Sequence, residues 1–340
     1  MPRRSALIAS ALVAACTVQR VDVANPPAVE EDHAAHMNPA DLRGPMAPDP
    51  SAQQGTPGLP ASNNSAAARL SASPRHGEWV KIAWETGSSD SLMAWVVYPV
   101  ARTKAPVVVV VHEIFGLSTW VRGVADQLAA DGFIAIAPDF ISRVRGGPSS
   151  VELSSDSARR IISGVSIPER NRAINAAASW AMMQASAEQK YAVVGYCWGG
   201  QTVWGHAVSG GVKGFSGGVA YYGGFPYSSG GQRATETTPA VPASIVADSI
   251  AKINAPVMLL NGSGDARIAA SMPTIDSLMK ARKKDYLGMN YEGAIHGFLR
   301  AQDDTAAGGG PSPAGAANLA ATKDAWPRTI AFLKKNLGVR

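Results

Sequence analysis

Three side chains suited to nucleophilic catalysis follow three separate apolar segments of the chain. Cys197 comes directly after "YAVVGY", Asp265 after "PVMLLNGSG" and His296 after "YLGMNYEGAI". A thiolate can attack a carbonyl carbon, an imidazole can move the protons, and a carboxylate can orient the imidazole. The sequence therefore predicts Cys197 as a nucleophile, His296 as its base and Asp265 as the acid that orients the base.

The residues around Cys197 have the spacing of a sharp turn between a strand and a helix. Glycines occur two positions before and two positions after it, in "GYCWG" at residues 195–199. Such a turn holds the nucleophile at its tip and at a helix N-terminus, which favours a thiolate. The alternative is a buried thiol at a tight turn without a chemical role. A second match, "GFSGG" at residues 214–218, precedes a predicted strand, so we predict that Ser216 lies in a loop.

Strands and helices are predicted to alternate through the chain from residue 75 onward. The continuous β-branched run "PVVVVVH" at residues 106–112 is typical of a strand buried on both faces. This alternation predicts an α/β fold with a mostly parallel central sheet and helices on both faces. The carboxyl ends of the strands are where such sheets place reactive residues. The expected strands span residues 78–84, 92–99, 106–112, 132–139, 191–196, 217–224, 256–262 and 286–293, and the expected helices lie near residues 120–128, 152–163, 168–185, 198 onward, 244–252, 270–283 and 319–337.

The first 16 residues have the features of an export signal. Arg3 and Arg4 precede a short apolar run, and "VAAC" ends at Cys16, as in bacterial lipoproteins whose cysteine is lipidated. We expect a protein that is exported and is periplasmic or anchored to the membrane by lipid on Cys16. Plain secretion is the second choice, and a twin-arginine signal is a further possibility.

Residues 17–74 lack apolar periodicity and are rich in Ala, Pro, Ser, Asn and Gly, which predicts a disordered tether. The folded domain is expected to span residues 75–340. The segment "HAAHM", with His33, His36 and Met37, offers too few ligand types for a metal site.

The overall composition excludes several function classes. The net charge of +5 is spread along the domain, which argues against nucleic-acid binding and agrees with a small anionic substrate. The sequence contains neither a Walker-type phosphate loop nor GxGxxG, and no metal-ligand cluster. We therefore expect a monomer that needs no metal or cofactor, and whose membrane contact is the N-terminal anchor alone.

Two charged residues lie next to the predicted site. Glu113 follows the 106–112 strand in "VHEIFGL", and Arg300 follows His296 in "HGFLR". A carboxylate at an apolar strand end needs a specific partner, although a surface position for Glu113 remains an alternative. An arginine is suited to binding a carboxylate.

With these motifs the sequence resembles the dienelactone hydrolase family from about Trp79 to Leu337. The resemblance rests on "HEIFG", "APD", "GYCWGG", "YYGG", "GSGDARI" and "HGFLR". It implies an α/β-hydrolase fold and a carboxymethylenebutenolidase-like enzyme that cleaves a lactone or ester without a cofactor. In this family the triad would be Cys197, Asp265 and His296.

The resemblance also implies roles for the residues around the triad. Glu113 would hold the resting thiol and take its proton, the amides of Ile114 and Trp198 would form the oxyanion hole, and Arg300 and Tyr222 would contact the substrate. The family has a second substrate arginine upstream of the nucleophile. Here four arginines crowd that region and none aligns cleanly, namely Arg159, Arg160, Arg170 and Arg172.

Three other functions compete with this interpretation. The chain could be a non-hydrolytic envelope lipoprotein that binds a ligand in the same cleft, or an esterase with an unrelated substrate range. The intact order of nucleophile, acid and histidine argues against the first. A thiol redox role is disfavoured because the domain has no second cysteine to resolve a disulfide.

Overall fold

The computed structural model of the chain describes residues 55–85, 87–101, 103–149, 153–229, 244–304 and 313–339. The predicted signal peptide, Cys16, the "HAAHM" segment and the first part of the predicted tether lie outside these residues. No helix among the described ranges is both long and apolar enough to cross a membrane.

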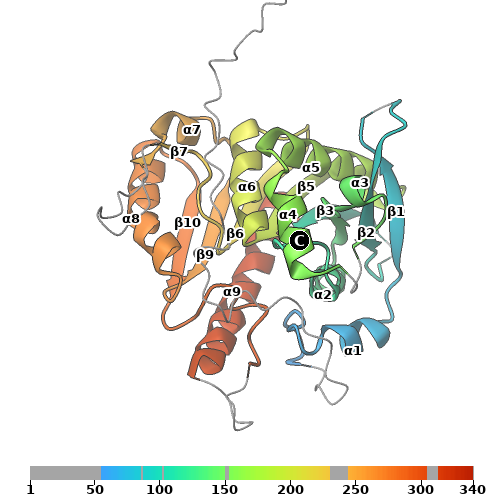
Figure 1. Ribbon diagram of the computed structural model, residues 1–340, viewed down its shortest axis with the longest axis horizontal. Coiled ribbons are helices and arrows are strands. Elements are labelled where there is room, and N and C mark those ends of the chain that lie inside the picture. Colours follow the sequence, from blue (N-terminus) through green and yellow to red (C-terminus); the bar gives the residue numbers. More distant parts are fainter. Residues whose placement is uncertain are drawn as a thin grey trace, which may run out of the picture.

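A mostly parallel sheet of eight strands forms the centre of the protein (Figure 1). Its order is β1-β2-β4-β3-β5-β6-β9-β10; β1 pairs antiparallel with β2, β2 pairs antiparallel with β4, and the other neighbours are parallel. This confirms the predicted fold class. The strands are β1 (Gly77–Ala83), β2 (Ser91–Val97), β3 (Ala105–Val111), β4 (Ile134–Pro138), β5 (Ala187–Tyr196), β6 (Phe215–Tyr221), β9 (Val257–Gly262) and β10 (Tyr286–Tyr291).

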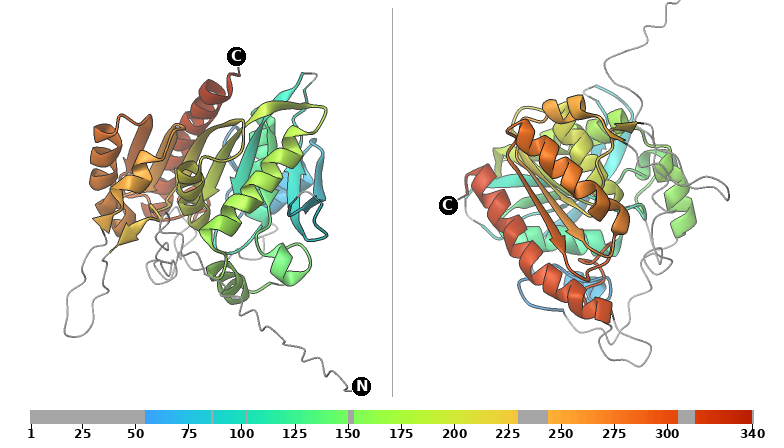
Figure 2. Two further views of the ribbon diagram at one scale, coloured as in Figure 1. Left: turned by 90° about the horizontal axis from the view of Figure 1, so that it is seen from above. Right: turned by 90° about the vertical axis from the view of Figure 1, so that its left-hand side faces the viewer.

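Helices cover both faces of this sheet (Figure 2). Helices α5, α6 and α8 lie on one face, and α2 and α9 on the other. Every residue of β3 and β4 is buried, as expected for β-branched and small residues covered on both sides. The helices are α1 (Ala66–Ser71), α2 (Thr119–Ala130), α3 (Ser142–Arg145), α4 (Ser155–Ser163), α5 (Ile167–Met182), α6 (Trp198–Ser209), α7 (Ala247–Ala251), α8 (Ala266–Ala281) and α9 (Pro313–Leu337).

Some local predictions were wrong. Ser216 lies in β6 and not in a loop, and its hydroxyl donates a hydrogen bond to the carbonyl of Gly214. A short antiparallel pair, β7 (Ser228–Ser229) with β8 (Ser244–Ile245), was not predicted because two-residue strands carry no periodic pattern. Helix α9 begins at Pro313, earlier than the predicted residue 319.

The predicted tether boundary at residue 74 was also wrong, because the chain from residue 55 onward packs on the domain. Leu59, Ala61 and Ala66 are buried. The Trp120 indole of α2 donates to the carbonyl of Ala61 over 2.9 Å. The amide of Asn63 donates to the carbonyl of Arg300 over 2.9 Å. This segment was misread because it contributes few apolar side chains, with no regular spacing.

Removing this packed segment is expected to destabilise the domain. A variant that lacks residues 1–74 should unfold roughly 5 °C or more below the full-length protein, since it exposes apolar surface on α2. A matched variant that lacks residues 1–54 should unfold at the full-length temperature, because that stretch has no apolar periodicity. Thermal denaturation followed by circular dichroism distinguishes the two variants. Equal melting temperatures would contradict a structural role for residues 55–74.

Candidate active site

The predicted strand–turn–helix around Cys197 is present. Cys197 follows β5, is the N-cap residue of α6 and has a positive φ of 57° with a ψ of −116°, which is a strained combination for a residue other than glycine. A Cβ atom at Gly195 would lie 2.1 Å from the carbonyl oxygen of Gly199, and one at Gly199 would lie 2.3 Å from that of Val111. Both glycines are therefore required for the close approach of α6 to the sheet. The thiol lies at the carboxyl edge of the sheet and is 1% exposed.

The structure brings His296 and Asp265 together beside Cys197. His296 Nδ1 and Asp265 Oδ2 are 2.6 Å apart, and Asp265 Oδ1 also caps α8 by accepting from the amide of Ile268. Burial lowers the pKa of His296, but the Cys197 and Asp265 charges raise it, so that its net pKa is about 10. Burial raises the pKa of Asp265, but the hydrogen bond and charge of His296, the Arg267 charge and the Ile268 amide together lower it below its ordinary value. The raised pKa favours a protonated His296 that is hydrogen-bonded to Asp265.

The raised pKa of His296 predicts a pH-dependent contribution to stability. The ordinary pKa of 6.5 rises to about 10 on folding, so the stabilisation is complete below pH 6.5 and is lost as the pH rises through about 10. The difference in melting temperature between the wild type and His296→Gln should shrink across that interval. In Cys197→Ala, the loss of stability should again begin near pH 6.5 but should be complete at a lower pH, because the folded pKa of His296 is lower without the charge at Cys197. A difference that stays constant up to pH 10 would contradict this assignment.

Glu113 and Arg300 form a buried ion pair. Arg300 Nε donates to Glu113 Oε2 over 3.0 Å, and both side chains are less than 10% exposed. Burial lowers the pKa of Arg300, but the charge of Glu113, together with smaller contributions from other nearby acidic groups, raises it above its ordinary value. Among the described residues no hydrogen bond joins Glu113 to Cys197, and Glu113 Oε1 has no hydrogen-bond partner. The surface alternative for Glu113 is therefore wrong, and the pairing with Arg300 was not predicted.

The other predicted site residues line the same edge. Tyr222 follows β6 with a φ of 38°, and its ring centroid is 5.0 Å from that of His296. Its buried hydroxyl has no partner among the described residues, and burial raises its pKa well above 10. The amides of Ile114, after β3, and Trp198, at the start of α6, have no acceptor in the described part of the chain. These groups could serve as donors to a bound molecule.

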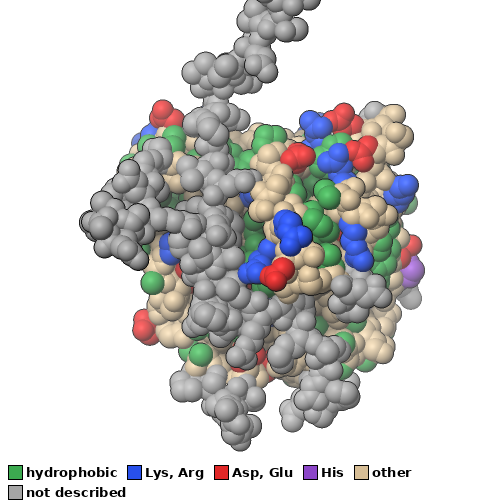
Figure 3. Space-filling model, viewed as in Figure 1, with side chains coloured by type: hydrophobic (Ala, Val, Ile, Leu, Met, Phe, Trp, Pro, Cys, Tyr) green, Lys and Arg blue, Asp and Glu red, His purple; other side chains and the backbone are tan. Residues whose placement is uncertain are grey.

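The four upstream arginines lie in different surroundings. Arg170 is buried, donates to the carbonyl of Val165 and to Gln201 Oε1, and places its guanidinium carbon 4.4 Å from the ring centroid of Trp198. Arg159 pairs with Asp156 and Arg172 with Glu85 at the surface. On the face of the protein shown in Figure 3, basic side chains likewise lie beside acidic ones. Arg170 is thus the arginine of the four that contacts an active-site element.

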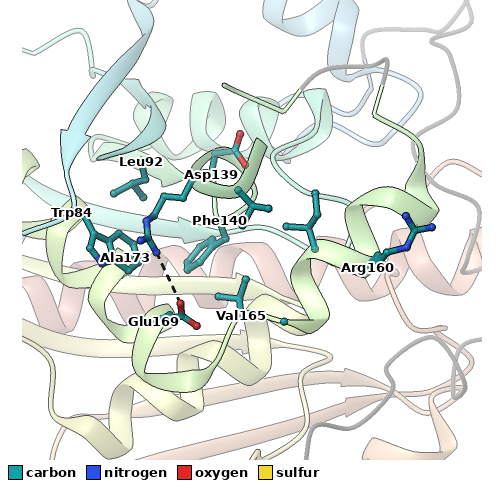
Figure 4. Close-up of a pocket in the computed structure, with 12 residues that line it drawn as sticks. Trp84, Leu92, Asp139, Phe140, Arg160, Val165, Glu169 and Ala173 are labelled. Carbon is teal, nitrogen blue, oxygen red and sulfur yellow. Dashed lines mark ion pairs between the residues drawn. The ribbon is translucent and has the colours of Figure 1, made fainter. Parts of the chain in front are cut away.

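Arg160 lines a separate cavity of about 350 Å³ next to this site (Figure 4). Trp84 lies at the opposite end of the cavity (Figure 4). The Arg143 guanidinium carbon is 3.8 Å from the Trp84 ring centroid, and Arg143 forms an ion pair of 4.0 Å with Glu169. Phe140 also lines the cavity, and its ring packs edge-on against Trp198 at 5.2 Å. Phe140 therefore connects the cavity to the Trp198 side chain, and neither Trp198 nor Cys197 is among the lining residues.

Sequence reasoning missed the residues that surround the Trp198 ring. His112 and Phe140 contact it and were assigned no role. Arg170 also contacts it and was one of four candidate arginines among which the sequence could not choose. For His112 a signal existed, since it directly precedes Glu113 at the end of β3. Within the described residues, no group of three or more His, Cys, Asp or Glu side chains is arranged to hold a metal ion.

Comparison with known proteins identifies the family. The dienelactone hydrolase family model matches residues 92–337. A Yersinia pestis protein named "Putative carboxymethylenebutenolidase" is 29% identical over 213 residues, which covers 62% of this chain and 74% of the relative. A Bradyrhizobium protein named "Probable 2-oxo-3-(5-oxofuran-2-ylidene)propanoate lactonase" is 25% identical over 264 residues, covering 76% and 94%.

The fold comparison agrees with this match. The crystal structure of "Putative Dienelactone Hydrolase from Klebsiella pneumoniae subsp. pneumoniae MGH 78578" superposes with a TM-score of 0.57 at 24% identity, covering 76% of this chain and 99% of that one. The family match over residues 92–337 agrees with the strand order and with the cysteine at the turn after β5. The chain belongs to the dienelactone hydrolase family, whose members are hydrolases.

Proposed function

We propose that the protein hydrolyses a carboxylic ester or lactone through a Cys197–His296–Asp265 triad. The observation that supports this most directly is the hydrogen bond of 2.6 Å between His296 and Asp265 beside the strained turn that holds Cys197. The family match and the names of the relatives agree with a lactone or ester substrate. The groups involved need no cofactor for this reaction.

The reaction would proceed in two steps through a thioester. The Cys197 thiolate attacks the carbonyl carbon, and the new oxyanion accepts hydrogen bonds from the amides of Ile114 and Trp198. When the tetrahedral intermediate collapses, the C–O bond breaks and the alkoxide takes a proton from the His296 imidazolium. His296 then removes a proton from water, which attacks the thioester and releases the carboxylic acid and the thiolate.

The Glu113–Arg300 pair points to a substrate that carries its own carboxylate. A substrate carboxylate near the ester would compete with Glu113 for the buried Arg300 guanidinium. Glu113, once released from Arg300, could take the proton of a resting Cys197 thiol. Binding of the correct substrate would thereby favour the thiolate that attacks it.

A panel of matched substrates tests this proposal. Each ester or lactone is assayed with and without a carboxylate, using wild type, Cys197→Ala and Glu113→Gln. We expect all turnover to depend on Cys197 and the carboxylate-bearing substrates to be preferred. Glu113→Gln should lower kcat/KM on the order of 10²-fold, because an amide cannot accept the thiol proton.

A control separates this loss from destabilisation. Glu113→Gln removes the carboxylate that neutralises the buried Arg300 charge, which costs up to about 3–5 kcal/mol. The double variant Glu113→Gln/Arg300→Met removes that charge and should recover stability without recovering the preference for carboxylates. Wild-type rates in Glu113→Gln would contradict the assigned role of Glu113.

A further inference from the structure

His112 makes two hydrogen bonds that fix its protonation state. Its Nδ1 lies 2.7 Å from the carbonyl oxygen of Glu113, which can only accept. Its Nε2 lies 3.2 Å from the backbone amide of Phe140, which can only donate. The ring must therefore be neutral with its proton on Nδ1. Burial lowers the pKa of this fully buried histidine, in agreement with a neutral ring.

The bond to Glu113 also fixes the direction of the next amide. The carbonyl of Glu113 and the N–H of Ile114 belong to one planar peptide unit, and the described chain has no cis peptide. In a trans unit the N–H points away from the side on which the carbonyl oxygen is held. That oxygen accepts from His112 and from the amide of Gly116 at 3.2 Å. The orientation of the Ile114 N–H is therefore set by the partners of Glu113.

The same imidazole packs against the residue that carries the other amide. The His112 and Trp198 rings are stacked, with centroids 5.9 Å apart and planes 13° apart. Phe140, whose amide binds His112 Nε2, packs edge-on against both rings. Trp198 is 1% exposed and is the first residue of α6. His112 thus contacts both segments from which the two amides project.

We propose that His112 is a positioning residue that orients the Ile114 and Trp198 amides so that both can donate to one oxyanion. This inference rests on the proposed function, because it assigns a use to amides that matter only if a tetrahedral oxyanion forms. His112 itself touches neither the substrate nor Cys197 in this account. It acts by fixing one peptide plane through a hydrogen bond and one indole through stacking.

Two substitutions separate the hydrogen bond from the stacking. His112→Phe retains a ring against Trp198 but cannot donate to the Glu113 carbonyl. His112→Asn loses the ring but places an amide N–H near the position of Nδ1. We expect His112→Phe to lower kcat roughly 10- to 10²-fold with little change in KM, since losing an oxyanion donor outright costs about 10²- to 10³-fold. His112→Asn should retain more activity than His112→Phe.

The rate at which iodoacetamide alkylates Cys197 distinguishes loss of the oxyanion hole from a general distortion of the active site, because only a general distortion would change that rate. The Cys197 sulfur displaces iodide from a saturated carbon, so no charge develops on a carbonyl oxygen and no oxyanion hole is needed. The alkylation rate of folded His112→Phe should therefore equal that of the wild type while kcat falls. A matched control is His206→Phe, which removes another buried histidine, bonded to the Tyr191 hydroxyl at the far end of α6. Its kcat should not change.

Each remaining outcome would overturn the proposal. These outcomes are wild-type kcat in folded His112→Phe, an equal fall of alkylation and kcat, and lower activity in His112→Asn than in His112→Phe. A parallel assay of Cys197→Ala distinguishes this failure from failure of the proposed function. If Cys197→Ala is inactive and His112→Phe is fully active, only the role of His112 is wrong. If Cys197→Ala hydrolyses at the wild-type rate, both are wrong.

Discussion

Replacing Cys197 by alanine is expected to lower kcat/KM by on the order of 10⁴-fold or more, as removal of a nucleophile does in other triads. The side chain is buried and small, so the fold should persist in this variant. Cys197→Ser is expected to be nearly as inactive, because a hydroxyl is much harder to ionise than a thiol beside the same His296. Initial rates with the best substrate of the panel, normalised to folded protein, measure both effects.

A control for this prediction is Ser216→Ala. Ser216 belongs to the second G-x-S-x-G match, but it lies in β6 with its hydroxyl bonded to the Gly214 carbonyl. Its removal should leave the rate unchanged. If Cys197→Ala is as active as the wild type, or if activity is lost with Ser216 instead, the nucleophile has been misassigned.

Asp265→Asn is expected to reduce kcat by on the order of 10³- to 10⁴-fold. Asparagine can still cap α8 by accepting from the amide of Ile268, so the local backbone should be retained. Its side-chain amide would, however, present a donor to His296 Nδ1 and favour the wrong tautomer. It would also remove one of the two negative charges that raise the pKa of His296.

The matched control for Asp265 is Asp126→Asn. Asp126 is also a buried carboxylate, but it bonds Arg75 at 2.6 Å, where the N-terminal segment meets α2. Its replacement should lower the melting temperature without changing kcat. Comparable losses of kcat in both variants would show that any buried charge change disturbs the enzyme, and the specific role of Asp265 would be unsupported.

The parts of this protein that are encoded locally could be predicted from the sequence. The valine run of β3 predicts a strand buried on both faces, and β3 is fully buried. The glycines two positions before and after Cys197 predict the sharp turn, because a side chain at either position would collide with the backbone there. The placement of Cys197, Asp265 and His296 after three parallel strands follows from that pattern, since parallel strands share one carboxyl edge.

The interactions that depend on tertiary packing could not be predicted in this way. Glu113 and Arg300 are 187 positions apart, and nothing local indicates that they pair. The segment around Ala61 looks unstructured because it is held by the Trp120 indole and not by its own apolar pattern. The contact between His112 and Trp198 likewise exists only once β3 and α6 are side by side.

Mass spectrometry of the enzyme, acid-quenched early in turnover of a lactone and then digested, shows directly which residue is acylated. Opening a lactone on Cys197 adds the whole mass of the substrate, because the released alcohol stays attached to the acyl group. We predict this increase on a single peptide, the one that contains "VVGYCWGG", and its disappearance in Cys197→Ala. An adduct on any other residue, or rapid turnover in Cys197→Ala, would contradict it.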